Sequence, residues 1–184
     1  VSSSHSTGRV TGYSNVGGLV GRNDGNVSNS YSTGFVYGPG GSTGGLVGEN
    51  LYATVSSSYC SGRVVGYEDV GGLVGSAFSG AVIDSYAAAS VTGDEGVGGL
   101  VGDSGGDVSN SYATGNVTVG GTHVGGLLGD NYGSVTNCHA TVSVAGMYTV
   151  GGLEGGDFGT VTNCYATGDV AGDSAVGGLV GASY

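Results

Sequence analysis

Hydrophobic positions return along the chain with a nearly constant period. The segment VGGLVG at Val97–Gly102 recurs unchanged at three other places and with one substitution at three more. Successive copies begin 27, 27, 27, 27, 26 and 26 residues apart. A fixed period of this size is typical of supersecondary units that bury their apolar faces only by stacking on their neighbours. Residues 1–184 are therefore predicted to form a single repeat array of seven units, without separate caps.

Three aliphatic columns appear when the units are aligned. One is the leucine of the glycine motif, and the others are valines four residues before and five residues after an aromatic position. Glycine-rich breaks separate the columns, which indicates about three short strands per coil. The predicted fold is all-β, a single-domain β-solenoid (parallel β-helix) of about seven 26–27-residue coils. The predicted core consists of Leu19, Leu46, Leu73, Leu100, Leu127, Leu153 and Leu179, of Val27, Val55, Val82, Val108, Val135 and Val161, and of the valines that follow the aromatic position.

The residue after the leucine predicts which way that strand faces. It is aliphatic in every unit except the sixth, where it is Glu154. An ionised carboxylate buried without a partner costs several kcal/mol, so we expect this column to face outward. An outward apolar stripe often marks a contact surface. The alternative is that scattered surface valines simply suit strand geometry.

The segment VSNSYATG at Val108–Gly115 predicts a second strand. If Val108 points inward, the period of two turns Asn110 and Tyr112 inward as well and leaves Ser109, Ser111 and Ala113 outside. The asparagine column then forms a hydrogen-bonded ladder, or else occupies a turn with left-handed backbone. The aromatic column is interpreted first as core or ladder, with a sugar-stacking platform as the alternative. Its tyrosines are Tyr31, Tyr59, Tyr86, Tyr112 and Tyr165.

Composition supports strands and limits the partners. Glycine supplies 44 of the 184 residues, and Gly, Ser, Thr, Val and Tyr favour turns and strands over helix. Three arginines, no lysine and 14 acidic residues give a net charge of −11, which disfavours nucleic acid as a partner. Without a run of about 20 apolar residues, membrane insertion is not expected either.

The repeat resembles a known family. The GGLVG core at Gly98–Gly102 and the SYATG segment at Ser111–Gly115 are similar to the GLUG repeat, and every unit carries the pattern. Such repeats are found in large microbial surface and secreted proteins, including adhesin-like chains. The resemblance implies a structural role at the cell surface or outside the cell, and it supplies no catalytic residues. His5, His139 and Glu154 depart from the pattern.

The array begins and ends inside a unit, with no segment that we identify as a cap. An uncovered solenoid end exposes unpaired backbone groups and an open core. Two explanations follow: the chain is a fragment of something longer, or its ends stack on other copies. The second explanation predicts end-to-end self-association.

Acidic clusters raise the question of calcium. Neighbouring coils could together supply the six to eight oxygens that Ca²⁺ requires, although the calcium-binding β-roll pattern is absent. We therefore expect no cofactor, with a stabilising calcium ion as the alternative. The acidic residues concerned are Asp103, Asp107, Asp130 and Asp157 after the glycine motif, and Glu68, Asp69, Asp94 and Glu95 in the other turn region.

No catalytic constellation is expected, and the chain is predicted not to be an enzyme. The segment GDSGGD at Gly102–Asp107 is similar to a serine-protease nucleophile sequence, but it is a repeat turn without a matching histidine context. His5 and His139 replace the aromatic residue of the repeat, and His123 lies in a predicted loop. No catalytic, cofactor-binding or metal-binding residues are assigned.

Two cysteines and a threonine column complete the candidates. Cys138 and Cys164 fall in one column on adjacent coils, where a separation of about 4.8 Å permits a disulfide, and a pair of free thiols is the alternative. Cys60 belongs to another column. Threonines in register could match an ice surface, but Ser61 and Ala88 interrupt the column.

Together these patterns predict a non-enzymatic extracellular structural module. It would form a self-assembling surface filament or the stalk or scaffold of an adhesin. The alternative is a ligand-binding solenoid, an adhesin module that binds ice or carbohydrate.

Overall fold

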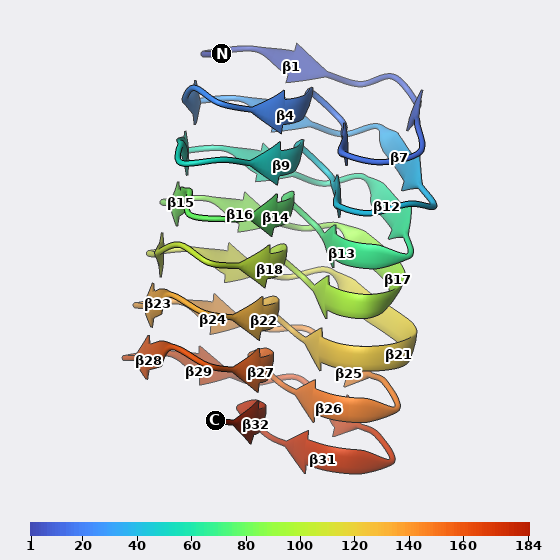
Figure 1. Cartoon of the computed structure of the whole chain (residues 1–184), viewed down its shortest axis with the longest axis vertical. Helices are drawn as coiled ribbons and strands as arrows, with labels where there is room; N and C mark the ends of the chain where they lie inside the picture. The colour runs from blue at the N-terminus through green and yellow to red at the C-terminus, as the bar shows by residue number, and fades with distance from the viewer.

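The computed structural model of the chain describes residues 1–119 and 121–184. It shows a β-solenoid of seven coils stacked along one axis, with the N-terminus and the C-terminus at opposite ends (Figure 1). Every strand pair is parallel and joins equivalent residues of adjacent coils, as in the register of Tyr59 with Tyr31 and with Tyr86. The described residues lie in short strands, bends and irregular connections, and none of them is helical. The all-β solenoid predicted from the period is confirmed.

Two narrow sheets begin each coil, except that the first coil contributes a strand only to the second of them. Sheet A has six strands and sheet B has seven, and each strand is two or three residues long. The strands of sheet A are β5 (Val27–Ser28), β10 (Thr54–Ser56), β15 (Ala81–Ile83), β19 (Val108–Ser109), β23 (Ser134–Thr136) and β28 (Thr160–Thr162). The strands of sheet B are β1 (His5–Ser6), β6 (Tyr31–Ser32), β11 (Tyr59–Cys60), β16 (Tyr86–Ala87), β20 (Tyr112–Ala113), β24 (His139–Ala140) and β29 (Tyr165–Ala166).

Sheet C follows with twelve strands in two columns. The first column contains β2 (Val10–Thr11), β7 (Phe35–Gly38), β12 (Arg63–Gly66), β25 (Val144–Ala145) and β30 (Val170–Ala171). The second contains β3 (Val16–Gly17), β8 (Thr43–Gly44), β13 (Glu68–Gly71), β26 (Tyr148–Gly151) and β31 (Ser174–Gly177). In the fourth and fifth coils one long strand runs through both columns, and these strands are β17 (Ser90–Gly98) and β21 (Asn116–Gly125).

Sheet D closes each coil with a four-residue strand. Most coils therefore contain five short strands, not three, because the glycine motif is split at Gly-Leu between sheets C and D. The seven strands of sheet D are β4 (Val20–Asn23), β9 (Val47–Asn50), β14 (Val74–Ala77), β18 (Val101–Ser104), β22 (Leu128–Asn131), β27 (Glu154–Asp157) and β32 (Val180–Ser183).

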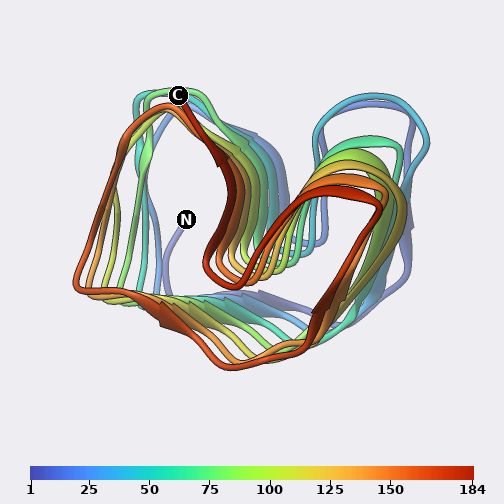
Figure 2. The same ribbon diagram turned by 90° about the horizontal axis from the view of Figure 1, so that it is seen from below.

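The cross-section is two-lobed and is pinched where sheet C meets sheet D (Figure 2). At this pinch the second glycine of the motif approaches sheet B from inside. A Cβ atom on Gly99 would lie 3.0 Å from the Cβ of Ala113, which is tighter than ordinary packing. The glycine pair is therefore required by the close approach of two backbones, and small residues of sheet B face it.

The aliphatic columns form the core in the inner coils. The leucines from Leu46 to Leu153 and the sheet A valines from Val27 to Val135 are all completely buried. In the first coil Leu19 is half-buried, and in the last coil Val161 is half-buried and Leu179 is 38% exposed. Stacking between coils therefore supplies the burial, at roughly 1.5–3 kcal/mol for each large aliphatic side chain.

The column after the leucine faces inward, so the outward assignment is wrong. The aliphatic members of the inner coils and Glu154 are all 0% exposed. The amides of Leu100 and Val101 both donate to the carbonyl of Leu127, at 2.8 and 3.1 Å, and the other coils repeat this arrangement. Two consecutive amides aimed at one acceptor mark a corner that interrupts strand alternation, so adjacent side chains can both point inside.

The side-chain directions predicted for the VSNSYATG segment are also wrong. Ser111 and Ala113 are buried, whereas Asn110 is exposed and Tyr112 lies at the surface. Asn110 has φ of 50°, and this left-handed residue forms a corner between sheets A and B that reverses the alternation. Ser111 is satisfied inside, since its hydroxyl donates to the carbonyl of Ser109 (2.7 Å) and accepts from the amide of Ser85 (3.1 Å).

Candidate functional site

A row of stacked aromatic rings covers the outer face of sheet B. Adjacent ring centroids are 4.9–5.0 Å apart and the ring planes differ by 3–7°, from His5 in the first coil to Tyr165 in the last. Since parallel strands lie about 4.8 Å apart, the sheet itself brings the rings to this stacking distance. The sequence analysis interpreted this column as core or ladder. The structure shows a ladder, and it lies at the surface. It consists of His5, Tyr31, Tyr59, Tyr86, Tyr112, His139 and Tyr165.

Polar columns run along both sides of this aromatic row. On one side, the exposed amide of Asn163 donates to Asn137 (2.6 Å) and that of Asn137 to Asn110 (3.4 Å). These residues also have positive φ, so the asparagine column is both a ladder and a turn. On the other side lie exposed threonines two residues after the rings, namely Thr7, Thr33, Thr114, Thr141 and Thr167.

A second arrangement lies where sheet C turns into sheet D. Residues with left-handed backbone lie in sheet C or just before its last strand, two residues or fewer from the valine of the glycine motif. Their side chains meet those of the third position in the strands of sheet D. The amide of Asn15 donates to Glu49 (2.8 Å), and Nδ1 of His123 lies 3.0 Å from Oδ2 of Asp130. Between these two pairs stand Asp69 and Asp103. We refer to Asp69, Asp103 and Asp130 as the acidic cluster.

The acidic cluster holds carboxyl groups that ionise reluctantly. Burial, with repulsion from Asp103, Glu68 and Asp130, raises the pKa of Asp69 to about 7. Burial and the charge of Asp130 raise the pKa of Asp103 to about 6. Burial also raises the pKa of Asp130, although His123 opposes this shift. The repeat thus brings together three like charges that lie far apart in the sequence.

Sequence reasoning did not bring these residues together. It placed His123 alone in a loop and divided the acids between two turn regions. Asp107 and Asp94 stay apart from the cluster on the exposed surface, and Asp157 accepts a hydrogen bond from Asn131 (3.1 Å). Within the described residues, no group of three or more His, Cys, Asp or Glu side chains is arranged to hold a metal ion.

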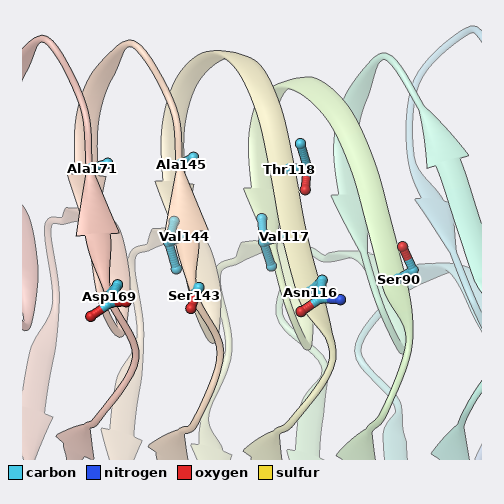
Figure 3. A pocket seen from close by; sticks show the side chains of 9 residues that line it. All are labelled: Ser90, Asn116, Val117, Thr118, Ser143, Val144, Ala145, Asp169 and Ala171. Atoms are coloured by element: carbon cyan, nitrogen blue, oxygen red, sulfur yellow. The ribbon is translucent and has the colours of Figure 1, made fainter.

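A shallow pocket of about 360 Å³ lies on the first column of sheet C (Figure 3). Figure 3 shows Ser90, Asn116, Ser143 and Asp169 following one another on successive coils along its rim. Asp169 is the only titratable side chain that lines the pocket. The pocket therefore offers hydroxyl and amide groups but no constellation for acid–base or nucleophilic chemistry.

The serine-protease-like segment contains no available nucleophile. Ser104 is completely buried in β18, and its hydroxyl donates to the carbonyl of Gly106 (3.1 Å). His5 and His139 take part in the aromatic row on the opposite side of the coil. The only His–Asp pair in the described part of the chain, His123 with Asp130, has no serine or cysteine bonded to the imidazole.

Cys138 and Cys164 lie on adjacent coils in one column, and both are free thiols. The amide of Cys138 donates to Sγ of Cys164 (3.3 Å), and each thiol donates to the carbonyl two residues before it. The spacing of about 4.8 Å between coils falls within the Cα separation that a disulfide allows, so closing the bond would require the two sulfur atoms to give up these hydrogen bonds. Burial raises the pKa of Cys138 and that of Cys60 to about 11.

A further aromatic column, missed in the sequence, lies beyond the end of sheet D. Tyr132, Phe158 and Tyr184 stack with centroids 4.8 and 4.3 Å apart. Phe78 occupies the same position two coils earlier, where it meets Tyr52 edge to face at 5.9 Å. The 26-residue spacing of the three stacked rings is the sequence signal for this column.

These features define a β-solenoid repeat protein that carries aromatic and acidic columns on its surface. A family model described as the GLUG motif matches residues 12–36, 66–92, 93–118 and 120–145, more than half of the chain. The chain therefore belongs to the GLUG-motif family. Comparison with curated proteins and with solved structures gives no match. Among the described residues, no helix is long and apolar enough to cross a membrane.

Proposed function

We propose that the chain is a non-enzymatic structural module that works outside the cell, a rigid solenoid that associates end to end as the subunit of a surface filament. The observation that carries this proposal is the difference between inner and outer coils. Leu153 and Val150 are completely buried under the next coil, whereas Leu179 and Val176 are 38% and 44% exposed. Burial of these columns therefore comes from the neighbouring coil, and a second copy of the chain could supply the same burial.

The two end faces are complementary by construction. Each inner interface joins the lower face of one coil to the upper face of the next in parallel register, which shifts only between Gly93 and Glu95 of the fourth coil. A head-to-tail contact between two copies would repeat this interface, and such a contact propagates without closing. An extracellular location is supported by the surface and secreted proteins in which GLUG repeats are found, and a structural role by the repetition itself.

Electron microscopy of the purified chain over a concentration series tests this proposal. We expect fibres that lengthen with concentration, and we expect Leu179→Asp to abolish them because it places a charge in the end contact. Tyr52→Asp, which adds the same charge at an exposed position away from the end faces, serves as the control. Short rods at every concentration would overturn self-assembly and favour an adhesin stalk.

The surface of sheet B favours a second candidate, a module that binds a neutral repeating polymer such as a glycan. Its aromatic row and the threonine column beside it run along the axis with one ring and one small residue per coil. Because Ser61 and Ala88 interrupt the threonines, this face fits a glycan better than a regular ice surface. A polysaccharide pull-down with wild type and Tyr86→Ala would separate the two candidates, since assembly does not require Tyr86.

A further inference from the structure

A pocket with aromatic walls lies on the outside of sheet D. It has a volume of about 370 Å³ and is lined by Phe78, Asp103, Gly105 and Tyr132. Phe78 and Tyr132 are 58% and 54% exposed, and they follow β14 and β22, two coils apart. Gly105 follows β18, the strand between them, and contributes no side chain (Figure 1).

The pocket is the place where a ring is missing from an aromatic column. Two coils separate the flanking residues by about 9.6 Å, which is twice the spacing of parallel strands. Farther along the same column, consecutive coils fill this spacing with stacked rings, Tyr132 on Phe158 at 4.8 Å and Phe158 on Tyr184 at 4.3 Å. A planar group can therefore enter between Phe78 and Tyr132.

The floor of the pocket is acidic, and His123 beside Asp130 is the basic side chain that the described contacts place there. Asp103 lines the pocket, and Asp69 and Asp130 stand close enough to affect its charge and that of Tyr132. Oδ1 of Asp103 and Oδ1 of Asp130 are buried without a hydrogen-bond partner among the described residues. Asp130 is only 9% exposed, and the partner of its other oxygen is His123.

At the start of the chain, an arginine side chain accompanies the acidic residues of this part of sheet D. There Arg22 occupies the sheet D position that Asp103 occupies in the fourth coil, and its Nε lies 3.8 Å from Glu49 and 3.4 Å from Asp24. Elsewhere the guanidinium of Arg9 lies over the ring of Phe35, 4.7 Å from its centroid. Guanidinium groups thus already meet both the carboxylates of this column and an aromatic face of this molecule.

We propose that the pocket binds a guanidinium group, which stacks between Phe78 and Tyr132 and donates hydrogen bonds to Asp103. A guanidinium is planar, carries the required positive charge and matches a carboxylate with two parallel donors. A neutral sugar would leave the acidic cluster uncompensated, and the described carboxylates do not form a metal-binding group. This inference goes beyond the structural role proposed above and does not depend on assembly.

Calorimetric titration with N-acetyl-arginine methylamide at pH 8 and low salt tests the proposal. We expect binding in the millimolar range, which is appropriate for one charged pair with stacking. The isosteric neutral citrulline derivative and methyl glucoside should bind at least about tenfold more weakly. Equal binding of either compound would overturn the assignment, as would the absence of arginine binding.

Two variants test whether the ligand binds at Asp103 and Tyr132. Asp103→Asn and Tyr132→Ala should each weaken binding of the arginine derivative about tenfold or more. Asp107→Asn removes the same charge from an exposed position in the same coil and should leave the affinity unchanged. Equal losses for Asp103→Asn and Asp107→Asn would show a general charge effect and overturn the site. Thermal unfolding of each variant verifies that it is folded.

The source of the guanidinium is resolved by a second titration. A capped pentapeptide with one central arginine should bind more tightly than the arginine derivative if the natural partner is a protein segment. Equal affinities would assign the pocket to a small guanidinium compound. Binding should also weaken as the pH falls from 8 to 5, because burial raises the pKa of Asp69 to about 7 and that of Asp103 to about 6, so that both carboxylates take up protons in this range. Asp130, Glu68, Glu95 and His123 are the other titratable side chains around the pocket.

Discussion

The fifth and sixth coils differ sharply at one buried position. Leu128 and Glu154 pair in register in sheet D, and both side chains are 0% exposed. In the fifth coil the position carries an apolar side chain, as in the other inner coils, whereas in the sixth it carries a carboxyl group with neither oxygen hydrogen-bonded within the described residues. The register of the solenoid, not the polarity of the residue, therefore decides what is buried.

Burial changes the chemistry of the sixth coil. It raises the pKa of Glu154 to about 8, and the charge of Asp157 adds to this shift. The carboxyl group is then neutral in the folded protein at pH 7, which avoids the cost of an unpaired buried charge. A single acidic residue in an apolar column is thus poor evidence that the column faces solvent.

The largest effect is expected when an ionised group is forced into an inner coil. Leu100→Asp should lower the free energy of unfolding by at least about 4 kcal/mol, because it removes a buried leucine and adds an unpaired charge. Urea unfolding followed by circular dichroism measures the loss. Leu100→Met keeps the volume and should cost less than about 1.5 kcal/mol. An unchanged unfolding midpoint in Leu100→Asp would contradict the inward facing of the leucine column.

The reverse change in the sixth coil should stabilise the protein. Glu154→Leu makes this coil resemble the fifth and should raise the free energy of unfolding by roughly 3 kcal/mol at pH 7, since each unit of pKa shift is equivalent to about 1.4 kcal/mol. Thermal unfolding of the two proteins side by side tests this. A destabilised Glu154→Leu would show that the carboxyl group is solvated or paired.

The pH dependence of stability sharpens the same comparison. Glu154 ionises near its ordinary pKa of 4.5 in the unfolded chain but only near 8 in the folded one. Between these values the unfolded state binds fewer protons, so stability falls as the pH rises and reaches its minimum contribution above pH 8. Asp69 and Asp103 act in the same direction up to about pH 7 and pH 6.

Denaturant unfolding from pH 4 to 9 should therefore show a steady decline for the wild type. In Glu154→Gln the decline should be smaller and should level off above pH 7, once Asp69 has ionised in the folded protein. A decline of equal size in both proteins would exclude Glu154 as its source.

Removal of a stacked ring should lower the free energy of unfolding by less than the changes above. The loss should be larger in an inner coil than in an outer one. Tyr86 stacks on Tyr59 and Tyr112, whereas Tyr165 stacks on His139 alone. Tyr86→Ala should cost about 1–2 kcal/mol and Tyr165→Ala about half of that. Equal costs, measured by urea unfolding, would mean that stacking contributes little beyond the strand itself.

No effect is expected from reducing agents. Cys138 and Cys164 are free thiols, and each donates a hydrogen bond to the carbonyl two residues before it. Intact mass spectrometry without reductant should find all three thiols in the protein, and the unfolding temperature should not change when reductant is added. A mass lower by two hydrogens would contradict the free thiols described for these coils.

Much of the fold could be predicted because it follows from the period. The spacing of the glycine motif gave the number of coils, and the invariant leucines and valines gave the core. Facing could not be predicted at the corners, since strand alternation is interrupted wherever a left-handed residue such as Asn110 or a shared acceptor such as Leu127 O turns the chain. Glu154 led to the wrong prediction that its column faces outward, because its pKa depends on surroundings that the sequence does not show.

The candidate sites were less predictable for a related reason. His123 and Asp130 are seven residues apart but meet across the turn from sheet C to sheet D, and Asp69 joins them from two coils away. The repeat alignment orders residues along columns and does not indicate which two columns face each other across a coil. The pocket between Phe78 and Tyr132 likewise depends on the absence of a side chain at Gly105.

The most direct test of this account is a carbon-13 NMR titration of the Glu154 carboxyl group in the folded protein. The register of the solenoid places this group in the core, so we predict a titration midpoint near 8. A midpoint near the ordinary value of 4.5 would show that the column after the leucine is open to solvent, and it would contradict the packing described for every coil.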